Sequence, residues 1–250
     1  MIDNITILVP YRGGSQSKTR LRLAQGERSL LGRAFLFDTL LACSASPLVR
    51  EVHVIGETSC PPNAPEINSK VSLWYARETS GLNRDLACAA DSLARPGPIA
   101  VVLADLPSLR PESLTEALAR ASEHNSATVS DHHEIGTTML FAQHKAAFRP
   151  SFGHGSHKRH VVQGSIALAR VSPRLKLDVD TQEDLAMAAK LGVGRYTLDA
   201  LSKIPSLRPS KLSGVTSRDV EGFPRPKSRS CGARGELRGV GSRGVAGLAE

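Results

Sequence analysis

Apolar residues recur along the chain with two alternating spacings, and each spacing predicts one kind of secondary structure. Short runs that are apolar almost throughout, such as residues 5–9 (ITILV) and 99–107 (IAVVLADLP), predict strands buried on both faces of a sheet. Apolar positions three or four apart, as in residues 30–44 (LLGRAFLFDTLLACS), predict helices with one buried face. Strands are expected at residues 5–9, 50–57, 71–76, 99–107, 126–130, 136–142 and 174–180, and helices at residues 30–44, 81–95, 111–124 and 181–191.

This order of elements predicts an α/β fold of the Rossmann-like, glycosyltransferase-A type. We expect a mostly parallel sheet with flanking helices and a small β insertion after residue 135. Periodicity is lost after residue 201, where the sequence becomes rich in Ser, Arg, Gly and Pro. Such a segment buries too little apolar surface to offset the entropy lost on ordering. We therefore predict one domain at residues 1–201 and a disordered basic tail at residues 202–250.

The formal net charge of +8 is concentrated in this tail. Residues 202–250 hold ten Lys and Arg against four Asp and Glu, which leaves 22 basic and 20 acidic residues in the rest of the chain. A nearly neutral body argues against nucleic-acid binding, except nonspecifically through the tail. No apolar run reaches the length of a membrane span, no signal-peptide pattern opens the chain, and the four cysteines lack paired spacing. We expect a cytoplasmic protein with free thiols.

The first candidate for chemistry is the segment VPYRGGSQSKTRL at residues 9–21, which leaves the first expected strand at Pro10. A Walker A loop would need glycines at positions 12 and 17, where this chain has arginine and serine, so the segment is not an ATPase P-loop. Its backbone N–H groups, together with Arg12, Lys18 and Arg20, could still bind polyphosphate oxygens. The alternative is a solvated basic loop.

A second candidate lies at the start of the helix expected at residues 81–95. Ser80 and Gly81 form a turn there, and Asn83 falls in the first helical turn. A side-chain amide both donates and accepts hydrogen bonds, so Asn83 suits a nucleotide base edge or a ribose hydroxyl. The alternative is ordinary helix capping.

Acidic residues end two of the expected strands. Asp105 follows a run that is otherwise apolar, where a carboxylate without a partner is costly. Magnesium held by one or two carboxylates and substrate phosphates would supply that partner; capping of the next helix through the Pro107 turn is the alternative. Asp178 and Asp180 are two residues apart, so on a strand they would point to the same face. One of them could instead cap the next helix, although Thr181 already suits that position.

Ligands bind beyond the carboxyl ends of strands in parallel α/β sheets, and all four candidate segments fall there. Together they favour a Mg²⁺-dependent nucleotidyltransferase. The motifs also resemble one family, the 2-phospho-L-lactate or phosphoenolpyruvate guanylyltransferases of coenzyme F-420 biosynthesis. The resemblance spans residues 9–185 and is carried by the following segments: VPYR, KTRL, GLN, ADLP, GTTML, FGHGS and LDVDTQEDL. It implies a molybdopterin-guanylyltransferase-like fold, and GTP and a phosphorylated three-carbon acid as substrates.

The resemblance also implies roles for particular residues. The metal aspartate falls on Asp105 with its partner in the pair Asp178 and Asp180, and the acid-substrate site falls on Thr138, Gly153 and Ser156. Pro10, Ser80, Gly81 and Asn83 are expected to contact GTP, while Arg12 and Lys18 stabilise the departing pyrophosphate. Arg159 or His160 is expected near the acid.

Two positions depart from the family pattern. Arg12 stands where the family usually has lysine, and the bulkier guanidinium changes the geometry available to a phosphate. His154 stands where a small residue is usual, and it could reach a substrate carboxylate.

Several alternatives are open at the level of sequence. The acid could be phosphoenolpyruvate, 2-phospho-L-lactate or 3-phospho-D-glycerate, and the next transferase of the same pathway is a possible partner. A molybdopterin or sugar nucleotidyltransferase is one competing function. A degenerate nucleotide-binding or nucleic-acid-binding protein is another, although the three candidate metal carboxylates argue against degeneration.

Overall fold

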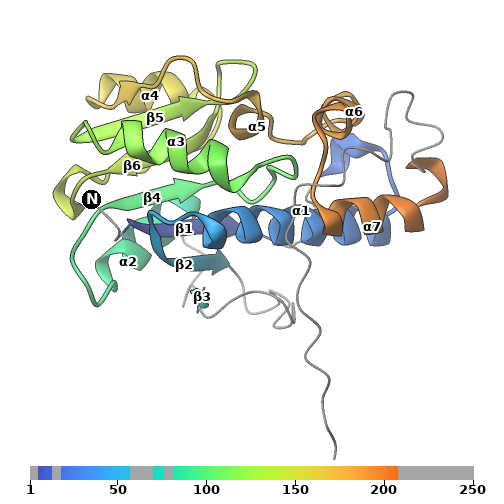
Figure 1. Ribbon diagram of the computed structural model, residues 1–250, viewed down its shortest axis with the longest axis horizontal. Helices are drawn as coiled ribbons and strands as arrows, with labels where there is room; N and C mark the ends of the chain where they lie inside the picture. Colours follow the sequence, from blue (N-terminus) through green and yellow to red (C-terminus); the bar gives the residue numbers. More distant parts are fainter. Residues whose placement is uncertain (1–4, 13–17, 57–69, 76–80, 208–250) are drawn as a thin grey trace, which may run out of the picture. The chain divides into compact units, whose positions relative to one another are not determined.

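The computed structural model describes residues 5–12, 18–56, 70–75 and 81–207, which build a sheet covered by helices (Figure 1). Seven strands pair within these residues, in the order β3-β2-β1-β4-β6-β5-β7. Strands β1 to β4 pair in parallel, β6 runs antiparallel to both of its neighbours, and β7 is parallel to β5. The predicted mostly parallel α/β sheet is therefore confirmed.

The bounds of the elements are as follows. The strands are β1 (Ile5–Tyr11), β2 (Val49–Gly56), β3 (Val71–Tyr75), β4 (Ile99–Val102), β5 (Ser126–Ser130), β6 (Thr137–Ala142) and β7 (Ile166–Ala167). The helices are α1 (Gln25–Ala45), α2 (Leu82–Asp91), α3 (Pro111–Ala121), α4 (Ser156–Val162), α5 (Pro173–Lys176), α6 (Gln182–Leu191) and α7 (Arg195–Lys203). Three 3₁₀ turns are described: η1 (Thr19–Leu21), η2 (Lys145–Ala147) and η3 (Pro205–Leu207).

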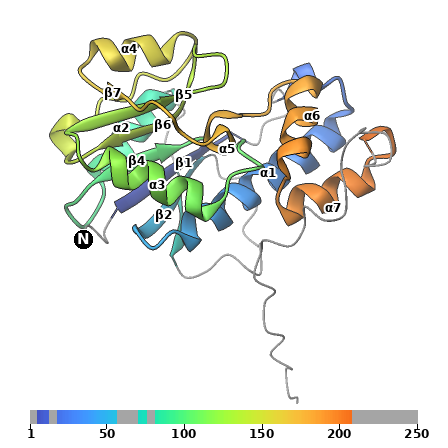
Figure 2. The same cartoon turned by 45° about the horizontal axis from the view of Figure 1, so that its top comes forward.

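Alternate residues of the central strands face two separate apolar layers. Ile7 and Val9 of β1 pack with α1 and α3, which lie side by side over one face of the sheet (Figure 2). Leu8 faces the other way and packs with α2. Burial on both faces is what the continuous apolar run of β1 predicts. In the described part of the chain, no helix is both long and apolar enough to cross a membrane.

A further apolar cluster joins the first half of α1 to the last described elements. Leu31 and Phe35 of α1 pack with side chains of α6, α7 and η3. Ile204 and Leu207 are buried in this cluster, so packed structure continues past the boundary predicted at residue 201, which falls inside α7. The rest of the predicted tail, from residue 208, lies outside the described residues.

Three local predictions need correction. Residues 174–180 do not form the predicted strand, because Pro173 starts the short helix α5, with the Ser172 hydroxyl accepting the N–H of Arg174. Residues 177–180 then pair with no strand among the described residues. Helix α4 was not predicted because its sequence, SHKRHVV, has few apolar positions, and α7 was not predicted because no side chain at its own start caps it.

The antiparallel direction of β6 determines which residues reach the carboxyl edge of the sheet. Val102, the last residue of β4, pairs with Met139 near the start of β6. The turn before β6 and the loop after β4 therefore lie at the same edge. The loop after β1 opens at this edge too, because β1 is parallel to β4.

Candidate active site

A lysine and two predicted metal ligands meet beyond the carboxyl ends of β1 and β4. Nζ of Lys18 lies 2.5 Å from Oδ2 of Asp105 and 2.8 Å from Oδ1 of Asp180. The backbone of Lys18 is left-handed, with φ of 56°. That conformation costs energy for a residue with a side chain and is concentrated at functional sites. The strained backbone of Lys18 is therefore a further sign that this residue belongs to a functional site.

Backbone hydrogen bonds fix the approach of the two acidic segments. The N–H of Val179 donates to the carbonyl of Asp105 over 3.0 Å. Asp184, in the first turn of α6, accepts the N–H groups of Asp180 and Thr181 through Oδ2. Asp178 and Asp180 both line one cavity, described below, although they do not lie on a strand.

The electrostatics of the group are dominated by its excess of carboxylates. Burial opposes the charge on Lys18, but Asp105 and Asp180 outweigh burial and raise the pKa of the ammonium, which stays protonated. Burial, together with the carboxylates of Asp105, Asp180 and Asp131, raises the pKa of Asp178 well above its usual range. One lysine thus leaves the negative charge of the group only partly compensated.

These residues fit an oxygen-coordinated divalent cation. Oδ1 of Asp105 is buried and has no hydrogen-bond partner among the described residues. Buried polar oxygens without a partner are rare and often indicate a ligand. Asp178 and Asp180 add further carboxylate oxygens, the donor type that Mg²⁺ prefers.

Two cavities open on either side of these aspartates. The β1 cavity, of about 370 Å³, is lined by Pro10, Tyr11, Arg12, Lys18, Gly32 and Phe35. The β6 cavity, of about 530 Å³, is lined by Arg20, the turn before β6, Thr137, the segment around Gly153, Ser156, Asp178, Asp180, Thr181 and Asp184. Asp105 and Asp180 line both cavities. Both volumes are typical of small-molecule sites.

Of the described residues predicted to contact GTP, Pro10 lines the β1 cavity, whereas Gly81 and Asn83 do not. Pro10 and Arg12 line it directly, and one guanidinium nitrogen of Arg12 lies 3.1 Å from Oδ2 of the buried Asp85 in α2. Gly81 begins α2 with a φ of 107°, which favours glycine. Asn83 bonds to the backbone N–H and carbonyl of Phe152, so it attaches α2 to the segment that enters the β6 cavity. Ser80 lies outside the described residues.

The residues predicted to bind the acid lie around the β6 cavity, with one exception. Gly153 and Ser156 line it, whereas the side chain of Thr138 is buried on the opposite face of β6, with Oγ1 3.5 Å from the carbonyl of Ser130. The side chain of Thr137 lines the β6 cavity in place of the predicted Thr138, because successive side chains on a strand point in opposite directions.

The Thr137 hydroxyl is held by a buried histidine. Nε2 of His160 accepts the N–H of Ser151, so in the neutral ring Nδ1 carries the proton and donates to Oγ1 of Thr137. Burial, with the charges of Arg159 and His157, lowers the pKa of His160 to about 4 and keeps the ring neutral. The Ser156 hydroxyl also donates to Thr137. Thr137 thus accepts two hydrogen bonds and can donate its own proton into the cavity.

The other two basic side chains predicted near the acid differ in position. Arg159 donates to the backbone carbonyls of Ser151 and His154, so it fixes the loop rather than lining the cavity. His154 lines the β6 cavity.

Four residues at the site were not predicted: Asp131, His132, His133 and Asp184. Oδ1 of Asp131 accepts the N–H of Ile135, and Oδ2 accepts that of Gly136, which closes the turn before β6. The sequence signal that could have identified these residues is the run DHHE, which directly follows the strand 126–130. Ligands bind at this edge of an α/β sheet.

Known proteins match most of this chain in sequence. The family model described as guanylyl transferase CofC like matches residues 5–218. A phosphoenolpyruvate guanylyltransferase from Geodermatophilus obscurus is 38% identical over 200 residues, covering 77% of this chain and 91% of the relative. One of the same name from Nocardia farcinica is 34% identical over 204 residues, covering 79% and 90%.

Solved structures show the same fold at lower identity. A protein described as a nucleotide-diphospho-sugar transferase, from Desulfovibrio desulfuricans G20, superposes with a TM-score of 0.60 at 16% identity. The match covers 84% of this chain and 99% of that one. The sequence matches to the two guanylyltransferases cover most of this chain and most of each relative. The chain is a nucleotidyltransferase that belongs to the CofC-like guanylyl transferase family.

Proposed function

We propose that the enzyme transfers GMP from GTP to a phosphorylated three-carbon acid and releases pyrophosphate. Phosphoenolpyruvate is the first candidate acid, because the relatives at 34–38% identity carry the name phosphoenolpyruvate guanylyltransferase. The product would be a guanosine-diphospho-acid, for use by the next transferase of coenzyme F-420 biosynthesis. The observation that carries the proposal is the meeting of two cavities at Asp105 and Asp180.

The two cavities suit the two substrates differently. The β1 cavity presents Arg12 and Lys18 to a polyanion, so we assign it to GTP. The β6 cavity presents the hydroxyls of Thr137 and Ser156 to a smaller polar molecule, so we assign it to the acid. The α-phosphorus of GTP and the phosphate of the acid would then meet between the cavities, at the aspartates.

The reaction requires positioning and charge compensation more than proton transfer. A phosphate oxygen of the acid, ionised at neutral pH, forms a bond to the α-phosphorus while the bond from that phosphorus to the pyrophosphate oxygen breaks. A divalent cation such as Mg²⁺, held by Asp105 and the pair Asp178 and Asp180, would neutralise phosphate charge. Lys18 would move from these carboxylates toward the leaving pyrophosphate, whose charge grows in the transition state.

Product analysis tests this function. Purified protein is incubated with Mg²⁺, GTP and each of phosphoenolpyruvate, 2-phospho-L-lactate and 3-phospho-D-glycerate separately, and the products are identified by mass spectrometry. We expect a guanosine-diphospho-acid and an equal amount of pyrophosphate with at least one acid, and none with the Asp105→Asn variant. Turnover of CTP or ATP with a sugar phosphate, and none of GTP with any acid, would refute the proposal.

A further inference from the structure

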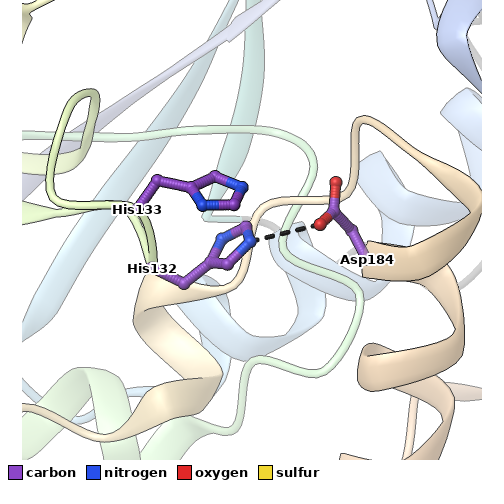
Figure 3. A group of neighbouring side chains, drawn as sticks. All are labelled: His132, His133 and Asp184. Carbon is purple, nitrogen blue, oxygen red and sulfur yellow. Dashed lines mark ion pairs between the residues drawn. The ribbon is translucent and has the colours of Figure 1, made fainter.

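Two histidines and an aspartate form a second group of metal-ligating side chains beside the aspartates (Figure 3). His132 and His133 lie in the turn between β5 and β6, and Asp184 lies in the first turn of α6. One ligand atom from each of the three lies within 4.8 Å of the others. Nε2 of His132 is 3.1 Å from Oδ1 of Asp184, and the two imidazole centroids are 3.8 Å apart.

Hydrogen bonds fix Asp184 and the turn that carries the two histidines. Oδ2 of Asp184 accepts the N–H groups of Asp180 and Thr181, which turns Oδ1 toward His132. The carboxylate of Asp131 closes the turn that carries both histidines. Outer hydrogen bonds of this kind orient ligands in metal sites.

A second observation points to a missing partner at the same place. Both ring nitrogens of His132 are buried, and neither makes a hydrogen bond within the described residues. They lie 3.5 Å from Asp178 and 3.1 Å from Asp184 without hydrogen-bond geometry. Buried polar atoms in this state call for a ligand, and an imidazole nitrogen is a good metal ligand.

We propose that His132, His133 and Asp184 bind a borderline divalent cation such as Zn²⁺, separately from the cation held by Asp105 and Asp180. Imidazole nitrogen selects Zn²⁺, Co²⁺ or Ni²⁺, whereas an all-oxygen group suits Mg²⁺. Three protein ligands leave a position open to solvent or substrate. The group lines the β6 cavity. If that cavity takes the acid, as the proposed function has it, the cation would face the acid substrate.

Metal binding by the protein without nucleotide tests the site independently of the proposed function. Metal-free protein is titrated in millimolar Mg²⁺, which competes for the aspartates, with Zn²⁺ by calorimetry and with Co²⁺ by visible absorption. We expect one Zn²⁺ per chain and Co²⁺ bands typical of four or five ligands. His132→Gln and His133→Gln should each weaken binding by about 10-fold or more. His133 is exposed, so its variant is expected to keep the fold.

Two variants serve as matched controls. His154→Gln removes another histidine of the β6 cavity, and Asp105→Asn alters the oxygen site. Both should bind Zn²⁺ like the wild type, and circular dichroism should confirm that every variant is folded. Unchanged Zn²⁺ affinity in folded His133→Gln, or no Zn²⁺ binding by the wild type in Mg²⁺, would overturn the proposal. In that case His132 only packs beside Asp178 and Asp184.

Discussion

Replacing Lys18 with methionine separates a catalytic role of this residue from a structural one. The substitution removes the charge and keeps most of the apolar stem. The Lys18 side chain is 12% exposed and that of Asp105 is 22% exposed, so their pair is largely buried. Breaking a buried pair costs about 3–5 kcal/mol. The Asp180 side chain is 49% exposed, so its pair with Lys18 contributes only about 0–1 kcal/mol.

We expect the variant to lose about 2–3 kcal/mol in metal-free buffer, since the cluster borders two open cavities and water relieves part of the cost. For a chain of this size that loss lowers Tm by roughly 4–12 °C. Mg²⁺ should restore more stability to the variant than to the wild type, because the cation no longer competes with an ammonium group for the same carboxylates. Calorimetry with EDTA and with Mg²⁺ measures this difference.

The kinetic effect should fall mainly on turnover. If Lys18 stabilises the departing pyrophosphate, its removal lowers kcat by about 10²-fold or more, with a smaller change in KM for GTP. Arg22→Met is a matched control, because Arg22 is an exposed cation of the same segment that does not line either cavity. A variant that loses stability and keeps kcat would show that Lys18 is only structural. If Tm and kcat both match the wild type, the segment is merely a solvated basic loop.

Three further predictions follow from buried or paired groups. Asp105→Asn should abolish turnover in steady-state assays while circular dichroism shows a folded protein; near wild-type turnover in Mg²⁺ would refute its role as a metal ligand. The pKa of His160 is about 4 in the folded protein against 6.5 in the unfolded chain, so the unfolded chain takes up the proton first as pH falls. The contribution of His160 to the free energy of unfolding is therefore complete above pH 6.5, and about 3 kcal/mol of it is lost as pH falls to 4. Urea unfolding of the wild type and of His160→Gln is compared across this pH range, and the variant should lack this loss of stability. Asp38, with a folded pKa of about 6, contributes in the opposite direction in both proteins, so its effect cancels. Identical pH profiles for the two proteins would contradict the prediction. Truncation after Arg218 keeps the whole family match and should leave Tm nearly unchanged. Truncation after Leu201 removes the buried side chains of Ile204 and Leu207 and should lower Tm by several degrees. Equal Tm values for the two truncated proteins would contradict this prediction.

The parts of the fold that could be predicted depend on local pattern alone. The continuous apolar runs of β1 and β4 indicated burial on both faces, and parallel sheets bind ligands at their carboxyl ends. These two facts were enough to bring Lys18, Asp105 and Asp180 to one edge. The strand predicted at residues 174–180 is wrong, but the alternation of buried and less buried side chains that it implied is present. Leu177 and Val179 are buried, and Asp178 and Asp180 are less so.

The parts that could not be predicted depend on contacts between distant residues. Helix α7 has no capping side chain of its own; Asp38 of α1 accepts the N–H groups of Tyr196 and Thr197 instead. Gly194 is required at the start of α7, because a Cβ there would lie 2.2 Å from the carboxylate carbon of Asp38. A cap supplied by a residue more than 150 positions away leaves no signal near the helix in the sequence.

The reversed direction of β6 explains why the second half of the chain forms the β6 cavity. In a parallel strand, the last residue would lie at the carboxyl edge of the sheet. Because β6 is antiparallel to β4, its first residue, Thr137, lies there, and so does the turn that precedes it. The turn brings His132 to Asp178, while β1 and α1 supply most of the β1 cavity from the first half of the chain. Changes in the turn before β6 should therefore alter use of the acid more than use of GTP, since only Asp105, Asp180 and two leucines line both cavities among the described residues.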